Sequence, residues 1–179
     1  MSTLETNLIQ PATGTTLTVG ASGDTIDIPS GATLDATGAT ITGALANAPY
    51  IRVKCATQAI SATTSTVLQF NNEVYDSESS FDTSTYRWTP QVAGTYFIGI
   101  NMYVSSMNDA NYAEITIQKN GSNIGNVQYT CAKSSTSAGV YIGTITELNG
   151  STDYVDGSAY LESAETMNGN AHIIGYRLI

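Results

Sequence analysis

The sequence predicts an all-β protein built as an antiparallel jelly-roll sandwich of two sheets. Only 12% of its residues are charged, and it contains eleven tyrosines and sixteen glycines. Its polarity comes mainly from Thr, Ser and Asn, which suit strands and turns better than helices. No stretch shows the apolar period of an amphipathic helix. Short alternating apolar runs recur instead between turn residues, and this spacing predicts eight to ten strands.

The first 49 residues differ from the rest of the chain and predict a separate arm. They contain no Lys, Arg or aromatic residue, and a Gly-x-Thr-aliphatic unit begins at Gly14, Gly23, Gly31 and Gly38. Each unit combines a glycine turn with a very short strand, as in residues 25–28. The apolar members of these units are Leu17, Val19, Ile26, Ile28, Leu34 and Ile41.

So few aliphatic side chains cannot build a core of their own. One interpretation is disorder, which the low-complexity composition favours. The other is an ordered β-repeat that intertwines with identical copies or holds a larger surface, which the fixed order of Gly, Thr and aliphatic favours. We expect the second, with residues 1–49 as an anchoring and trimerisation arm and residues 50–179 as a knob domain.

Apolar alternation predicts the strands of the knob. Residues 51–56 alternate strictly and form its first expected strand, and residues 67–70 form the next. The pair Asn71-Asn72 predicts a turn, and residues 76–80 predict an acidic loop. Further strands are expected at residues 112–118, 124–131, 140–148, 154–161 and 171–179. In the first of these, one face carries Ala113, Ile115 and Ile117 and is expected to be buried.

Residues 81–104 hold the single tryptophan, Trp88, and the longest strand-like run. A short strand is expected at residues 86–89 and ends at Pro90, which lacks a backbone donor. Gly94 then provides a turn before a long strand at residues 95–104. We expect these two strands to form a hairpin that packs on a partner sheet.

Two Asn-Gly pairs predict tight turns. Asn120-Gly121 lies between two alternating runs and predicts a type I′ hairpin, because both residues tolerate positive φ. Asn149-Gly150 predicts a second tight turn of the same kind. Each pair also begins a glycosylation sequon, but the turn is the better explanation for both.

The motif Tyr-Arg-Trp-Thr-Pro, followed by Gly-Thr-Tyr-Phe at residues 94–97, resembles the signature of the complement globular-head and tumour necrosis factor superfamily. Lys-Asn-Gly at residues 119–121 and the closing Gly-Tyr-Arg at residues 175–177 resemble later parts of the same pattern. The resemblance covers residues 50–179 and implies a ten-stranded jelly roll that assembles as a homotrimer. Its core motif residues here are Phe81, Trp88, Gly94, Tyr96, Phe97, Gly175 and Tyr176.

The chain as a whole also resembles structural proteins of tailed bacteriophages, in which a jelly-roll knob follows short Thr- and Gly-rich β-segments. This resemblance implies a capsid decoration (cement) protein or a fibre knob. Eleven tyrosines exceed the needs of one small core and suit packed interfaces.

The net charge of −9 argues against nucleic acid and anionic membranes as partners, since six basic residues cannot neutralise a phosphate surface. The first residues lack the basic and apolar regions of a secretion signal, so we expect synthesis in the host cytoplasm. No run approaches the roughly 20 apolar residues of a membrane span.

Residues with catalytic or metal-binding chemistry are sparse, and no enzyme activity is expected. His172 is the single histidine, which excludes His-rich zinc sites. Cys55 and Cys131 predict buried free thiols, with a disulfide as the alternative. No cofactor is expected. Calcium is the alternative to this expectation, since calcium prefers oxygen donors and two loops carry several carboxylates. These are Asp76, Glu78 and Asp82 in one loop and Glu162 and Glu165 in the other.

These observations predict a homotrimeric capsid decoration protein on the exterior of the virion. Its arm would bind the major capsid protein or other virion subunits. The arm reaches at most about 165 Å fully extended, which suits a short foot better than a long fibre shaft. The alternative is a tail fibre or tailspike knob that binds a host surface glycan or receptor. Its expected contacts are Tyr103, Tyr112, Tyr129 and Tyr160.

Overall fold

The computed structural model describes residues 13–16, 18–25, 27, 29–33, 48–133 and 136–178. The chain divides into two units, residues 1–41 and residues 42–179, and the second unit contains the knob. The domain boundary expected at residue 49 stays a prediction, because residues 34–47 lie outside the described ranges.

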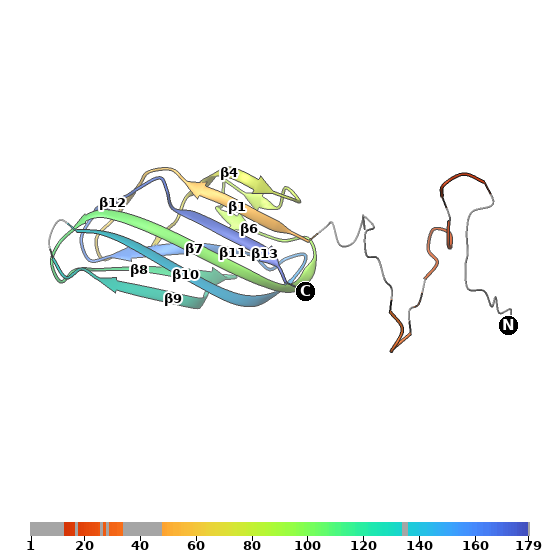
Figure 1. Cartoon of the computed structure of the whole chain (residues 1–179). Helices are drawn as coiled ribbons and strands as arrows, with labels where there is room; N and C mark the ends of the chain where they lie inside the picture. Colours follow the sequence, from red (N-terminus) through yellow and green to blue (C-terminus); the bar gives the residue numbers. More distant parts are fainter. Residues whose placement is uncertain are drawn as a thin grey trace. The chain divides into compact units, whose positions relative to one another are not determined.

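The knob consists of two antiparallel sheets, and its described residues form thirteen strands and no helix (Figure 1). Sheet A has the order β2 (Gln58–Ile60), β12 (Glu165–Met167), β7 (Ala93–Met107), β13 (His172–Arg177), β1 (Tyr50–Cys55) and β4 (Phe70–Asp76), with β10 (Thr136–Asn149) also paired to β7. Sheet B has the order β5 (Phe81–Asp82), β6 (Arg87–Trp88), β11 (Val155–Leu161), β8 (Tyr112–Lys119) and β9 (Ser122–Thr130), with β3 (Thr66–Val67) also paired to β11. The all-β sandwich is confirmed. The strands that the sequence did not predict are β2, β5 and β12, which have two or three residues each.

The core lies between the sheets and follows the period of two in each strand. In β8, Ala113, Ile115 and Ile117 are fully buried, as their alternation predicts. Tyr96, Ile98, Ile100, Met102 and Val104 of β7 face them from sheet A. Burial of such side chains is the main favourable term in folding.

Both cysteines are free and buried, which confirms the expected thiols. Burial raises the pKa of the Cys55 thiol to about 11, against a smaller lowering by the backbone of Gln69. This thiol is therefore almost entirely protonated, and thus a weak nucleophile, at neutral pH.

The Asn120-Gly121 hairpin joins β8 to β9 as expected. Both residues have positive φ, 52° and 78°, as a type I′ turn requires. Asn149-Gly150 also forms a turn, in which the Asn149 side-chain oxygen accepts hydrogen bonds from the amides of Ser151, Thr152 and Asp153. This second turn connects the two sheets, because β10 belongs to sheet A and β11 to sheet B.

Two sequence predictions for the first half of the knob are wrong. The strands at Trp88 and at residues 95–104 do not form a hairpin. β6 pairs with β5 and β11 in sheet B, whereas β7 pairs in sheet A. Residues 90–92 therefore cross between the sheets. Asn71-Asn72 is not a turn but part of β4, an edge strand on which polar side chains stay exposed to water.

Trp88 joins the two sheets through its contact with Gly175. The indole is fully buried and lies against β13, so that a Cβ on Gly175 would stand 2.1 Å from a ring carbon of Trp88. The ring also meets Tyr96 edge-on, with centroids 5.4 Å apart. Its N–H donates to the Ser80 hydroxyl at 2.9 Å, which satisfies its one polar group.

Gly175→Ala should destabilise the knob by about 1–3 kcal/mol, because the methyl group overpacks the indole. The matched control is Gly139→Ala in β10, where an added Cβ meets no atom within 4 Å. Urea unfolding followed by tryptophan fluorescence measures both variants. Equal midpoints for the two would show that the Trp88–Gly175 contact does not limit stability.

Candidate interaction surfaces

The outer face of sheet A carries a row of apolar side chains that no part of the knob covers. Tyr50, Tyr176, Phe97 and Ile145 lie side by side in register across β1, β13, β7 and β10. Ile145 is 62% exposed and Tyr176 is 44% exposed. Three more tyrosines of sheet A are exposed, and we call the whole set the aromatic face: Tyr50, Tyr75, Phe97, Tyr103, Tyr141, Ile145 and Tyr176.

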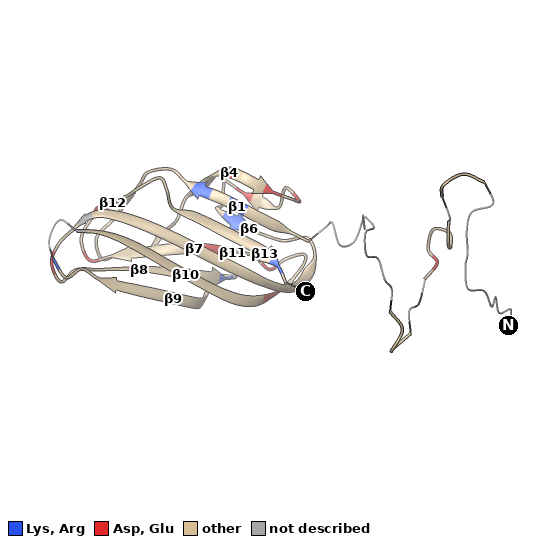
Figure 2. Ribbon diagram, viewed as in Figure 1, with Lys and Arg blue, Asp and Glu red and all other residues tan. Residues whose placement is uncertain are grey.

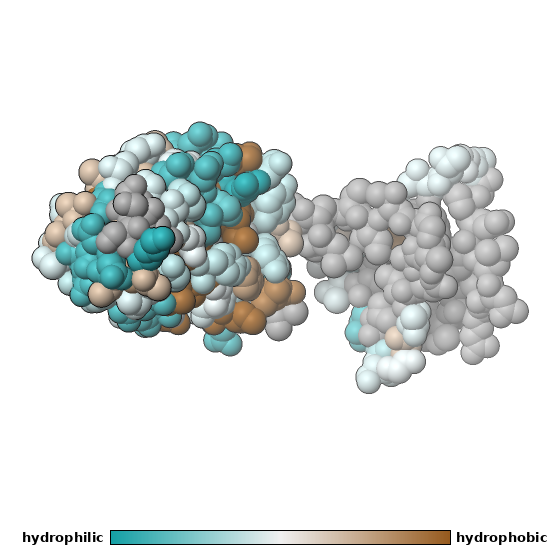
Figure 3. Space-filling model, turned by 60° about the vertical axis from the view of Figure 1, so that its left-hand side comes forward, coloured by the Kyte–Doolittle hydropathy of each residue, from teal (hydrophilic) through white to brown (hydrophobic). Residues whose placement is uncertain are grey.

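Two glycines let the rings of this face lie flat. A Cβ on Gly143 would stand 2.8 Å from a ring carbon of Phe97, and one on Gly99 would stand 2.9 Å from the Tyr141 hydroxyl. Phe97 and Tyr176 also pack together, with centroids 5.3 Å apart. The rings therefore lie along the sheet. The surface of the knob as a whole is pale and teal with brown hydrophobic patches in Figure 3.

Unpaired cations border the aromatic face. Arg52 and Lys54 extend from β1, whose basic residues appear blue in Figure 2. Among the described residues, the two ion pairs are Arg87 with Asp156 and Lys119 with Asp153, so neither cation of β1 is neutralised. The Arg52 Nε is buried without a hydrogen-bond partner. A partner with acidic groups would complement this border.

His172 lies in β13 next to these cations. Burial lowers the pKa of its imidazole, and the positive charges of Arg52 and Lys54 lower this pKa further. A hydrogen bond with the Asn170 carbonyl raises the pKa but offsets only part of the decrease. His172 is therefore neutral at neutral pH and adds no charge to the face.

The outer face of sheet B has a different character. Tyr112 and Tyr160 stack there with centroids 5.4 Å apart, at an interplanar angle of 18°. A hydrogen bond with Tyr160 and partial burial raise the pKa of the Tyr112 phenol. Glu114 is the register partner of Tyr160, and Gln128 is the next residue across in β9. This surface combines stacked rings with amide and carboxylate groups.

The four tyrosines predicted to contact a ligand do not form one site. Tyr112 and Tyr160 come together on sheet B. Tyr103 belongs to sheet A, and Tyr129 packs against the core from β9. Among the core motif residues, Phe81, Trp88, Tyr96 and Gly175 are buried. Gly94 is the second residue of β7 and pairs with Leu148, so the turn expected there is wrong. Phe97 and Tyr176 instead point outward.

The arm is described only in part. Val19 is 60% exposed, whereas Leu17, Ile26, Ile28, Leu34 and Ile41 lie outside the described residues. Two glycine turns of the repeat are formed: the Asp24 amide donates to the Ala21 carbonyl, and the Ala32 amide donates to the Pro29 carbonyl. Gly23 and Gly31 occupy their third positions with φ of 94° and 88°, as in type II turns. Contact of the arm with a capsid stays a prediction.

The acidic loop before β5 uses its carboxylates to hold its own backbone. Asp76 accepts hydrogen bonds from the amides of Glu78 and Phe81, and Asp82 accepts them from Ser84 and Thr85. The bonds from Ser84 and Thr85 lower the pKa of Asp82 to about 2. No group of three or more His, Cys, Asp or Glu residues gathers within the described part of the chain. Calcium binding stays a prediction.

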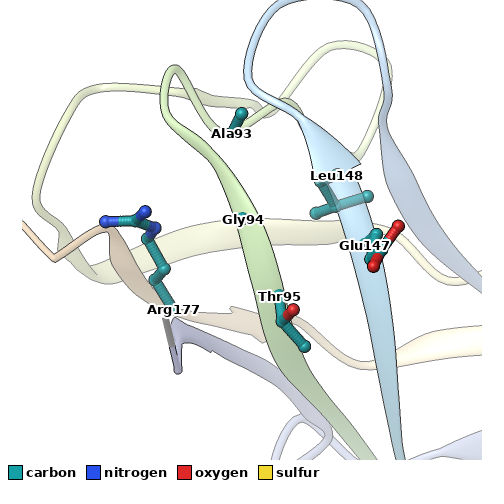
Figure 4. Close-up of a pocket in the computed structure, with 6 residues that line it drawn as sticks. All are labelled: Ala93, Gly94, Thr95, Glu147, Leu148 and Arg177. Atoms are coloured by element: carbon teal, nitrogen blue, oxygen red, sulfur yellow. The ribbon is translucent and has the colours of Figure 1, made fainter.

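A cleft of about 460 Å³ opens at the end of sheet A where the chain enters the knob (Figure 4). It is lined by Ala93, Gly94, Thr95, Glu147, Leu148 and Arg177. Arg177 and Glu147 lie on opposite sides of β7 in this view. The lining offers one cation (Arg177), one carboxylate (Glu147) and one hydroxyl (Thr95). Among the described residues, no helix has the length and apolar character needed to cross a membrane.

No protein-family model matches the chain, and no curated protein matches it. Among solved structures, the crystal structure of murine APRIL at pH 5.0 matches with a TM-score of 0.56. The match has 8% sequence identity and covers 74% of this chain and 100% of that chain. The knob has a tumour necrosis factor-like jelly-roll fold. At this identity the likeness concerns the fold alone, and it confirms the jelly-roll fold that the motif around Trp88 implies.

Asp156 of β11 is an unusual feature of sheet B, because it is a carboxylate only 5% exposed. Its Oδ2 lies 3.4 Å from the Arg87 Nε, and its Oδ1 is buried without a partner. The Arg87 guanidinium stacks on the Tyr154 ring, 4.0 Å from its centroid. Burial raises the pKa of Asp156, and the Arg87 charge offsets only part of the increase.

This raised pKa predicts a pH effect of known sign. The folded state binds the proton of Asp156 more tightly than the unfolded state, whose pKa is about 3.9. Stability from this group is therefore greatest at acid pH and falls as pH rises through the folded pKa. Asp156→Asn should remove that fall, so the variant gains stability relative to wild type as the pH rises above about 4.

The control is Asp153→Asn, which should have the opposite sign. Hydrogen bonds from Asn120 and Lys119 lower the pKa of Asp153, so its contribution is present at neutral pH and is lost in acid. Denaturant unfolding at several pH values measures both variants. Parallel pH curves for Asp156→Asn and wild type would show that the carboxylate is not destabilised by burial.

Proposed function

We propose that the protein is a homotrimeric structural protein of a phage virion that decorates the capsid exterior and attaches through its arm. The observation that carries the proposal is the uncovered aromatic face of sheet A. A contiguous exposed surface of flat aromatic and aliphatic side chains typically marks a protein interface.

A second copy of the chain is the partner that fits this face. The chain carries a net charge of −9, so a neighbouring copy brings acidic groups to the unpaired Arg52 and Lys54. A symmetric contact between two aromatic faces would instead place these cations opposite one another. The contact is therefore heterologous, and heterologous contacts that close produce rings. The tumour necrosis factor-like fold supports a ring of three.

The arm provides the attachment in this proposal. Its Gly-x-Thr-aliphatic repeats contain too few apolar residues for a core of their own. Three arms on one trimer bind together, and multivalency converts weak individual contacts into stable attachment.

A receptor-binding knob is the second candidate, and the outer face of sheet B favours it. The stacked Tyr112 and Tyr160 offer an aromatic surface beside Glu114 and Gln128. Sugar rings stack on such rings, and amide and carboxylate groups bind their hydroxyls. This face stays free when sheet A is used for assembly.

Tyr176→Arg should convert the trimer into monomers, because it places a charged side chain in the middle of the apolar row that the neighbouring copy would cover. The control is Gln128→Arg, which adds the same charge to the exposed face of sheet B and should leave the trimer intact. Sedimentation velocity measures the mass of both variants. A trimeric Tyr176→Arg protein would place the interface elsewhere.

Electron microscopy of intact virions tests the location. Antibody against the knob should label the capsid exterior, and purified full-length trimers should bind capsids that lack the protein. Labelling of the tail, or binding of the trimers to host cells but not to capsids, would replace the decoration function with the receptor-binding alternative.

A further inference from the structure

Strand β10 forms an edge of sheet A that is open for another strand. It pairs with β7 from Ala138 to Asn149 and has no second strand partner among the described residues. The other edge strands are blunted. β2, β3 and β5 have two or three residues, and β4 carries Glu73, Asp76 and register shifts. β9 carries asparagine and glutamine side chains and a register shift.

The hydrogen bonds of β7 show which groups of β10 point outward. The Leu178 amide donates to the Thr95 carbonyl, and the Asn168 amide donates to the Tyr103 carbonyl, so these residues of β7 direct their backbone groups away from β10. Their register partners in β10 are Glu147 and Gly139. In an antiparallel ladder, two facing residues that are not hydrogen-bonded to each other both direct their N–H and C=O groups away from the partner strand. Glu147 and Gly139 therefore direct these groups away from β7.

The outward set therefore contains Gly139, Tyr141, Gly143, Ile145 and Glu147. The Lys119 ammonium confirms the direction at one end, because it donates to the Glu147 carbonyl at 2.7 Å. It also pairs with Asp153 at 2.9 Å, which fixes it there. Lys119 therefore blocks strand pairing at the Glu147 end of the edge. The stretch from Gly139 to Ile145 carries no charged residue and has no strand paired to its outward side.

An open edge of this length and composition is a site for strand addition. Gly139–Ile145 has the sequence Gly-Val-Tyr-Ile-Gly-Thr-Ile, rich in β-branched and aromatic residues. Tyr141 and Ile145 are 55% and 62% exposed on the aromatic face beside this edge. A strand added here would bring its apolar side chains against both.

We propose that the open edge of β10 binds residues 25–28 of the arm of a neighbouring copy by main-chain hydrogen bonds. The inference rests on the proposed assembly, because it needs copies held side by side. Thr25-Ile26-Asp27-Ile28 has the strict alternation of a strand with one apolar face. Its isoleucines would lie on the same face as Tyr141 and Ile145, next to one of the two, and Thr25 and Asp27 would lie on the opposite face, toward β9. The turn at Ala21–Asp24 precedes it and limits its length.

Residue-resolved amide hydrogen exchange on the full-length oligomer tests this directly. The inward amides of β10, such as Val140, Ile142 and Thr144, are bonded to β7 and should be protected in every state. The outward amides of Tyr141, Gly143 and Ile145 should be protected as well if a strand is added. Slow exchange along the whole run is the expected result.

Proline substitutions in the arm identify the donor. Successive residues of a strand direct their N–H groups to opposite sides, so one of Ile26→Pro and Asp27→Pro removes a bond to β10. That variant should raise exchange at the outward amides about tenfold or more and leave the inward amides unchanged. The control is Ser22→Pro, at the second position of a type II turn, where proline is favoured.

Fast exchange at the outward amides of wild type would overturn the proposal, as would protection that neither proline variant reduces. Sedimentation of the same samples separates this test from the proposed function. A trimer with fast outward exchange removes only the strand addition, whereas a monomer removes the assembly itself. Mixing isotope-labelled and unlabelled copies should place the labelled arm against an unlabelled β10, and contacts within one copy alone would overturn the inference.

Discussion

The contact between Trp88 and Gly175 is the constraint on which the rest of the knob depends. Trp88 belongs to sheet B, and Gly175 belongs to the central strand β13 of sheet A, so one fully buried ring sets the spacing of the sheets. Tyr96 of β7 packs edge-on against the indole, with ring centroids 5.4 Å apart. Because protein interiors are close-packed, a fixed contact of this size also fixes the strands on either side.

The position of β13 in turn creates the surface that carries the proposed function. With Gly175 directed inward, Tyr176 must point outward, where it meets Phe97 and Tyr50. Gly99 and Gly143 then let the rings lie along the sheet rather than stand away from it. The knob therefore has one apolar face bordered by cations and one polar face, and the two suit different partners.

The sequence predicted the fold well where local chemistry decides structure. The alternation of Ala113, Ile115 and Ile117 and the positive φ of Asn120-Gly121 needed no knowledge of distant residues. The wrong predictions concern pairing over longer distances. Trp88 and β7 are near in sequence but lie in different sheets. The chain crosses between the sheets at Pro90 because the Trp88 indole packs against Gly175 of the opposite sheet. Asn71-Asn72 is compatible with a turn, but two polar side chains are equally compatible with an edge strand whose side chains are exposed to water.

The sequence by itself determined the fold class, the buried thiols and the motif around Trp88, since composition, alternation and turn residues act locally. Only the tertiary structure decided which tyrosines share a surface and which strand edge stays open. Tyr112 meets Tyr160, whereas Tyr129 turns toward the core and Tyr103 lies on the opposite sheet. Such neighbours come from register and strand order, which depend on contacts between residues far apart in the chain.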